Sequence, residues 1–243
     1  MIVTGLISSY KKVIWTQIYY LCGELARPVN EMKKFKSIAV ILAALAVTSC
    51  TGSKKQNAMN SREPAKILVV VDLQKDFING TLPAKNGAEI IPYIDSVKSK
   101  FDKVYFTLDW HPYNHCSFKK YGGIWPEHCV QYTEGASLPD GILEGLDNSR
   151  LQFLPKGNDP AKEEYGQFSK PAREYADLFV KGDVVVVCGI AAEYCVLETL
   201  KNLERISKEI GFELYLYLEG VACIESNDPL LEYMNEANIK LYK

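Results

Sequence analysis

The sequence has little of what marks a membrane-spanning or nucleic-acid-binding protein. Its longest apolar run, residues 38–47, is about half as long as the roughly 20 residues that a helix needs to cross a bilayer. Neither sign of charge is in excess, since 28 basic residues stand against 30 acidic ones. We therefore expect no nucleic-acid partner. Repeats and low-complexity tracts are also absent. With 47% apolar and 24% charged residues among 243, the composition is that of an ordinary globular protein.

The short apolar run near the start fits a targeting segment. Residues 32–36 supply positive charge before it, and Val47-Thr48-Ser49-Cys50 supplies small residues after it. The block V-T-S-C resembles a bacterial lipobox. That resemblance implies lipidation at Cys50 and a polar tether over residues 50–65. The alternative is a short buried helix that ends at an ordinary cysteine.

These features divide the chain into three parts. Residues 1–49 form an upstream region with a lipoprotein signal at about 32–49, residues 50–65 the tether, and residues 66–243 one folded domain. We expect a domain in the bacterial cell envelope that contacts the membrane only through its lipid anchor. A cytoplasmic location is the alternative if the signal is not used. The sequence leaves open whether translation starts at Met1 or Met32, and whether the protein forms a homo-oligomer.

Short β-branched runs alternate with amphipathic stretches in the domain. Residues 67–71 and 184–188 are continuously apolar, as expected of strands buried on both faces. Further strands are predicted at 103–108, 213–218 and 239–242, and helical spacing of apolar residues is found over 90–101 and 196–206. This alternation favours parallel pairing with right-handed crossovers. We expect a three-layer α/β/α domain around a mostly parallel, Rossmann-like sheet. Two irregular stretches, 109–149 and 156–171, interrupt the pattern.

The three histidines of the chain are concentrated in one short segment. His111, His115 and His128 lie within eighteen residues of one another, and Asp109 precedes the first by two positions. Imidazole and carboxylate groups suit Zn, Fe or Mn, and alternate residues at a strand end point to the same side. We therefore expect one divalent metal ion here. The alternative is that they are ordinary core or surface histidines.

Two further side chains suit nucleophilic chemistry. Cys195 opens a helix directly after the 184–188 strand, where the helix dipole would lower the pKa of its thiol. Asp72 ends the first apolar strand, where burial would raise the pKa of its carboxyl toward that of a general base. The alternatives are a small buried cysteine and a turn or N-cap aspartate. Lys156 is the weakest candidate by sequence alone, since most lysines are solvated.

Five blocks of the domain, in order, resemble the nicotinamidase branch of the isochorismatase-like cysteine hydrolases. The resemblance implies an Asp-Lys-Cys triad of Asp72, Lys156 and Cys195. It also implies metal ligation, most simply of zinc, by Asp109, His111, His115 and His128. The blocks are V-D-L-Q-K-D-F (71–77), D-W-H-P-Y-N-H-C-S-F (109–118), W-P-E-H-C-V (125–130), K-G (156–157) and G-I-A-A-E-Y-C-V (189–196).

The resemblance also implies a reaction and further site residues. The reaction is the metal-dependent deamidation of nicotinamide to nicotinate and ammonia through a cysteine thioester, a step of NAD salvage, with pyrazinamide as an analogue. Backbone N–H groups of Ala191 and Cys195 would form the oxyanion hole beside a cis peptide between Ile190 and Ala191. The aromatic pocket residues would be Phe77, Trp125 and Tyr165.

Two other functions stay open at this point. The domain could hydrolyse another small amide or an isochorismate-like substrate without its metal, or be a catalytically silent surface lipoprotein that binds a ligand or a metal. The segment 157–168 is longer and more charged than the resemblance leads us to expect.

Overall fold

The computed structural model describes residues 62–243, which form a six-stranded sheet with helices on both faces. The strand order is β3-β2-β1-β4-β5-β6, and every neighbouring pair is parallel. The predicted α/β class with its parallel sheet is therefore confirmed. The strands are β1 (Lys66–Val71), β2 (Lys103–Asp109), β3 (Leu151–Lys156), β4 (Val184–Ile190), β5 (Glu213–Ala222) and β6 (Lys240–Leu241).

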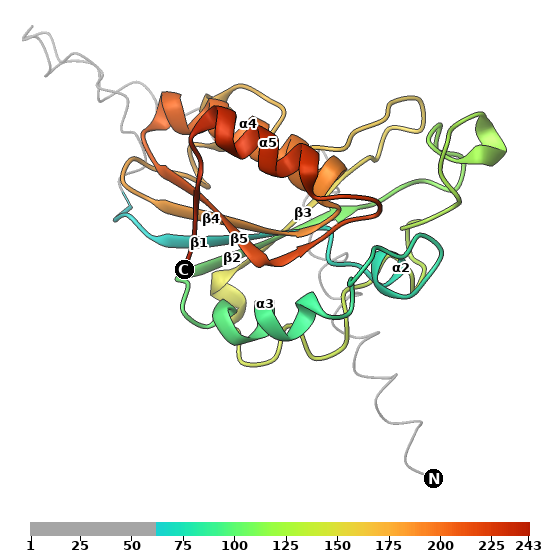
Figure 1. Ribbon diagram of the computed structural model, residues 1–243, viewed down its shortest axis with the longest axis horizontal. Helices are drawn as coiled ribbons and strands as arrows, with labels where there is room; N and C mark the ends of the chain where they lie inside the picture. The colour runs from blue at the N-terminus through green and yellow to red at the C-terminus, as the bar shows by residue number, and fades with distance from the viewer. Residues whose placement is uncertain (1–61) are drawn as a thin grey trace, which may run out of the picture. The chain divides into compact units, whose positions relative to one another are not determined.

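The helices complete three layers. Figure 1 shows α4 and α5 on one face of the sheet and α3 on the other. One π-helical turn, Ala192–Val196, directly precedes α4, and single 3₁₀ turns punctuate the loops. None of the helices among residues 62–243 is long and apolar enough to span a bilayer. The α-helices are α2 (Lys75–Ile78), α3 (Ile90–Lys98), α4 (Leu197–Ile210) and α5 (Asp228–Ala237).

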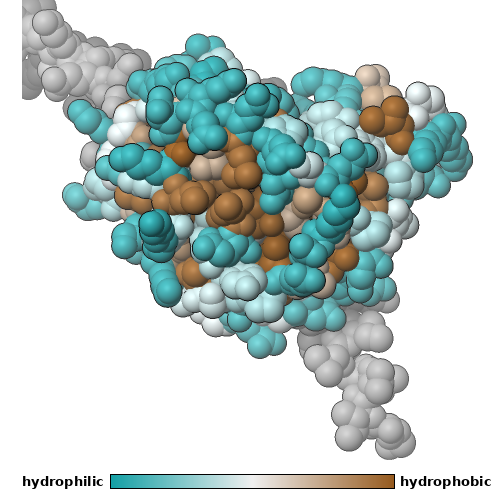
Figure 2. Space-filling model, viewed as in Figure 1, coloured by the Kyte–Doolittle hydropathy of each residue, from teal (hydrophilic) through white to brown (hydrophobic). Residues whose placement is uncertain are grey.

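The centre of the sheet is buried, because the two middle strands carry apolar side chains on both faces. Residues 67–71 of β1 and 185–188 of β4 have no exposed surface. Apolar residues also gather near the middle of the face seen in Figure 2, where hydrophilic side chains surround them. The tight packing around β1 and β4 therefore keeps these two strands rigid and holds the residues at their ends in defined positions.

Gly189 allows β4 to lie tightly against β1 near the end of both strands. Its φ is +121°, and a Cβ atom at this position would lie 2.0 Å from the carbonyl oxygen of Val71. Only glycine has room there. The close approach brings the turn after β4 next to Asp72, which follows β1.

Three elements differ from the sequence-based expectation, and the shortest of them, α2, has only four residues. β3 was not predicted, because its pattern is that of an edge strand with several exposed side chains and a proline at position 155. α5 was also not predicted, since only two of its residues, Leu230 and Met234, are buried. The predicted signal segment and Cys50 lie outside the described residues.

Candidate active site

The carboxyl ends of four adjacent strands carry the four polar side chains at the centre of the site. Asp72 follows β1, Asp109 ends β2, Lys156 ends β3, and Cys195 lies in the turn after β4. Asp109 and Lys156 are register partners in the parallel β2–β3 pair. Each of the four residues is at most 5% exposed. Parallel pairing thus brings together residues that are distant in the sequence.

Lys156 joins the acidic groups of the site. Its Nζ atom lies 2.8 Å from Oδ2 of Asp72, donates to the carboxylate of Asp109, and lies 3.6 Å from Sγ of Cys195. Burial disfavours the ammonium form, but the charges of Asp109 and Asp72 outweigh it and hold the pKa of Lys156 well above its usual value. Lys156 is therefore a fixed positive charge within reach of the sulfur.

Asp72 has one satisfied oxygen and one that lacks a well-aligned partner. Thr107 donates its hydroxyl to Oδ1 at 2.6 Å. Oδ2 accepts no hydrogen bond of good geometry, although the ammonium of Lys156 is its ion-pair partner at 2.8 Å. Burial raises the pKa of Asp72, more than the Lys156 charge lowers it. A carboxylate oxygen of Asp72 lies within 4.8 Å of Sγ of Cys195, so this carboxylate is placed to accept the thiol proton.

Burial favours the protonated thiol form of Cys195. Burial raises the pKa of its thiol well above the usual value, and the opposing effect of Lys156 is smaller. The structure thus differs from the expectation that the helix dipole lowers this pKa, because the cost of burying a thiolate is larger here. A nucleophilic Cys195 consequently needs a base, and Asp72 lies beside it.

The backbone turns sharply between β4 and Cys195. The peptide bond between Ile190 and Ala191 is cis, and Ala191 lines the pocket together with Cys195. The two residues predicted to provide oxyanion N–H groups are therefore at the pocket wall. Their role in binding an oxyanion stays a prediction.

Three of the four predicted metal ligands converge. A carboxylate oxygen of Asp109 and ring nitrogens of His111 and His128 lie within 4.8 Å of one another, and all three residues are buried. Nδ1 of His111 donates to the carbonyl of Gly157 at 3.1 Å, and Nδ1 of His128 donates to that of Pro126 at 2.8 Å. Both Nε2 atoms therefore face Asp109, at 3.5 and 3.9 Å from its Oδ2.

The donor set suits a divalent transition metal. Burial opposes the charge of Asp109, but Lys156 and His111 outweigh it and keep the pKa of this carboxyl well below its usual value. Burial lowers the pKa of His128 and so favours the neutral imidazole that metals require, whereas at His111 the Asp109 carboxylate outweighs burial and raises the pKa of the ring. One carboxylate and two imidazoles leave coordination positions open, as catalytic metal sites do.

His115 is not a member of this donor set. Its ring stacks on that of His111, with centroids 4.1 Å apart. Its Nε2 donates to the carbonyl oxygen of Lys162 at 3.0 Å, and its Nδ1 accepts from the Ser117 hydroxyl at 2.7 Å. Both ring nitrogens therefore have hydrogen-bond partners within the protein, and metal ligation by His115 stays a prediction.

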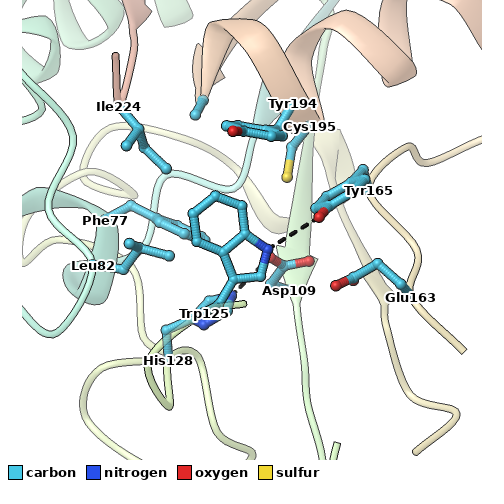
Figure 3. Close-up of a pocket in the computed structure, with 11 residues that line it drawn as sticks. Phe77, Leu82, Asp109, Trp125, His128, Glu163, Tyr165, Tyr194, Cys195 and Ile224 are labelled. Atoms are coloured by element: carbon cyan, nitrogen blue, oxygen red, sulfur yellow. Dashed lines mark hydrogen bonds and ion pairs between the residues drawn. The ribbon is translucent and has the colours of Figure 1, made fainter. Parts of the chain in front are cut away.

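Cys195 of the triad and the metal donors Asp109 and His128 line one pocket, with an empty volume of about 320 Å³ that includes open solvent. Figure 3 shows the Trp125 indole at its centre, with its Nε1 bonded to the Tyr165 hydroxyl at 3.0 Å. All three predicted aromatic residues line it. Four other residues that line the pocket are not expected from the sequence, namely Leu82, Glu163, Tyr194 and Ile224.

Little in the sequence could have identified those four residues. Only Tyr194 gave a signal, since it directly precedes Cys195 in the G-I-A-A-E-Y-C-V block. The others reach the pocket from separate loops. A thiol, a base and an ammonium group beside a metal-donor set, all at the carboxyl edge of a parallel sheet, define a cysteine hydrolase of the α/β class.

Comparison with known proteins identifies the family. No protein-family model matches the chain. The nicotinamidase of Acinetobacter baylyi is 31% identical over 186 residues, which cover 67% of this chain and 84% of that protein. The pyrazinamidase of Pyrococcus horikoshii, solved in complex with zinc, is 37% identical with a TM-score of 0.60 and covers 74% of this chain and 99% of its own.

A third relative is PnC1 of L. infantum, solved in complex with nicotinate. It is 30% identical, has a TM-score of 0.63, and covers 73% of this chain and 92% of its own. The chain belongs to the nicotinamidase family.

Proposed function

We propose that this protein hydrolyses nicotinamide to nicotinate and ammonia, a step that returns nicotinamide to NAD synthesis. The observation that carries the proposal is that Cys195, Asp72 and Lys156 meet beside three metal donors, at an aromatic-lined pocket into which Cys195 opens. The zinc in the P. horikoshii relative and the nicotinate in the L. infantum relative support it.

The attack uses the three triad side chains. Asp72 takes the thiol proton through its free oxygen, and the ammonium of Lys156 stabilises the thiolate that forms. The sulfur of Cys195 attacks the carboxamide carbon, and the oxyanion is held by backbone N–H groups of Ala191 and Cys195. The C–N bond then breaks as Asp72 returns its proton to the leaving nitrogen, and ammonia departs.

Hydrolysis of the thioester uses the same base. Asp72 takes a proton from a water molecule as the water oxygen attacks the thioester carbon, and the C–S bond breaks. Asp72 then returns this proton to the departing sulfur, and the acid loses its own proton to solvent, which leaves nicotinate and the free thiol. A divalent ion held by Asp109, His111 and His128 would supply a Lewis acid that binds and orients the ring. Phe77, Trp125 and Tyr165 would enclose the ring.

The test is ammonia and nicotinate release from nicotinamide by the purified, zinc-loaded protein. Cys195→Ala should abolish turnover, whereas Cys116→Ala, at a half-buried thiol outside the pocket, should retain it. Activity that survives Cys195→Ala would overturn the mechanism. Turnover that is insensitive to a chelator would favour a metal-free route on another amide. A metal-loaded wild type that releases no ammonia would favour a binding protein.

We also propose that the protein is a lipoprotein of the cell envelope, anchored through Cys50. Its support is the sequence pattern of residues 32–50 alone, with the tether at 50–65 and the hydrolase domain at 66–243. Labelled palmitate should enter the full chain expressed in bacteria, and Cys50→Ala should lose both the label and the membrane fraction. Equal recovery of both proteins in the cytoplasm would contradict the anchor.

A further inference from the structure

One charged residue of the pocket wall has no place in the mechanism above. Glu163 comes from the segment between β3 and β4, and Figure 3 shows its carboxylate directed into the cavity beside Tyr165 and Asp109. Within residues 62–243, no lysine, arginine or histidine forms an ion pair with Glu163. Its Oε1 accepts the backbone N–H of Glu164 at 3.0 Å. The pocket wall therefore carries a carboxylate that has no ion-pair partner among residues 62–243.

The adjacent acidic residue differs in this respect. Glu164 pairs with Nζ of Lys162 at 2.9 Å and accepts the backbone N–H of Gly157 at 3.3 Å. Glu163 also lies outside the converging donor set of Asp109, His111 and His128. The structure thus assigns Glu163 neither to an ion pair nor to the metal-donor cluster.

The segment that carries Glu163 is fixed at both ends. On one side, His115 donates to the carbonyl of Lys162 at 3.0 Å, and the N–H of Cys116 donates to the carbonyl of Pro160 at 2.8 Å. On the other side, the Thr199 hydroxyl accepts the N–H of Gln167 at 3.2 Å. The carboxylate is consequently held at the pocket, and the hydrogen bond from His115 is one of the contacts that hold it there.

The charge matters because the reaction changes the charge of the bound molecule. Nicotinamide is neutral, whereas nicotinate carries one negative charge after hydrolysis. Like charges repel, and the repulsion is stronger in a pocket that is partly shielded from water. A nearby carboxylate therefore weakens the binding of the product more than that of the substrate.

We propose that Glu163 is a specificity residue that excludes anions from this pocket. It leaves the neutral carboxamide free to bind, promotes release of the carboxylate product, and selects against anionic substrates of similar size. This inference rests on the proposed function, because it assumes that the amide and the acid occupy this pocket.

The experiment compares binding of the two molecules. For Glu163→Gln, the inhibition constant of nicotinate divided by the KM of nicotinamide should fall about fivefold to tenfold relative to wild type. Glu163→Asp, which keeps the charge, should retain the wild-type ratio. Glu209→Gln is the matched control, since Glu209 lies in α4 about 20 Å along the helix from Cys195 and loses the same charge.

The outcomes are distinguishable. An unchanged ratio in Glu163→Gln, or an equal fall in Glu209→Gln, would overturn the inference. So would loss of bound zinc in Glu163→Gln, because Glu163 would then act on the metal. Should Glu163→Gln fail to fold, Glu163→Ser provides the same test. If wild type does not hydrolyse nicotinamide, the proposed function fails instead.

Discussion

Two buried carboxylates lie at opposite ends of the central strands and differ in how they are bonded. Asp183 directly precedes β4, at the amino edge of the sheet, and Asp72 directly follows β1, at the carboxyl edge. Neither has any exposed surface. Each also faces a basic side chain, Arg62 for Asp183 and Lys156 for Asp72, with closest distances of 2.5 and 2.8 Å.

The two carboxylates differ in how many hydrogen bonds they accept. Asp183 accepts two bonds from Arg62, one from the N–H of Ala65 and one from the N–H of Val180, so both of its oxygens are satisfied. Asp72 keeps Oδ2 without a well-aligned donor. A fully bonded buried carboxylate stabilises the fold, whereas one with a free lone pair beside a thiol can move a proton. The predictions below test this contrast.

The largest expected effect is that of Asp72→Asn. The amide has no basic lone pair for the thiol, so kcat should fall about 100- to 10,000-fold. Lys156 keeps Asp109 as its partner, and the free energy of unfolding should change little. Nicotinamide hydrolysis and urea unfolding of the same preparation measure the two quantities. A variant that loses stability but keeps its turnover would reverse the assignment of Asp72.

Two histidines at the carboxyl edge of the sheet, His111 and His115, also differ in how their ring nitrogens are bonded. The Nε2 atom of His111 faces Asp109, whereas both ring nitrogens of His115 are hydrogen-bonded to other residues of the protein. We expect His111→Gln to weaken zinc binding at least about 100-fold and His115→Gln to weaken it less than about tenfold. Competition with a chromophoric chelator measures both. Equal losses would make His115 a ligand after all.

Asp183→Asn should show the opposite pattern to Asp72→Asn. An amide cannot satisfy Arg62 and both backbone donors, so the free energy of unfolding should fall by about 3 kcal/mol. Below the unfolding transition, kcat/KM should match wild type, since the change lies at the far edge of the sheet. Asp95→Asn, at an exposed partner of Lys98, is the control and should stay within about 0.5 kcal/mol. A large drop in kcat for Asp183→Asn would show that the two edges are coupled.

Site residues could be predicted from the sequence where a local apolar pattern defines the strand that carries them. β1, β2 and β4 are continuous apolar or β-branched runs, so Asp72, Asp109 and Cys195 could be placed at strand ends from sequence alone. Lys156 could not, because β3 is an irregular edge strand. Lys156 could be assigned to the site only through the resemblance to the nicotinamidase branch.

Side-chain contacts over long sequence distances account for the rest. The role of His115 depends on a carbonyl at residue 162, and Glu163 enters the pocket from an irregular segment with no periodicity. The pKa of Cys195 likewise depends on burial by the whole fold, which the local helix position did not reveal.

The smallest effect concerns Tyr105, which belongs to the amino-edge network. Its hydroxyl donates at 3.0 Å to the carbonyl of Leu178, which also accepts from Arg62. Burial raises the pKa of Tyr105 to about 12, above the roughly 10 of an unfolded chain. The folded protein thus holds this proton more tightly, so the resulting stability is complete below about pH 10 and is lost as the pH rises toward 12.

Tyr105→Phe removes both the hydrogen bond and this pH dependence. The free energy of unfolding should fall by about 1 kcal/mol at neutral pH. Between pH 10 and 12 the free energy of unfolding of Tyr105→Phe should decline less steeply with pH than that of wild type. The difference in slope should correspond to at most about one proton. Urea unfolding across this range measures the slope, with Tyr113→Phe, at a largely exposed tyrosine, as the control. Identical slopes in wild type and Tyr105→Phe would mean that this hydroxyl is not held by the network, and the amino edge would then depend on Asp183 alone.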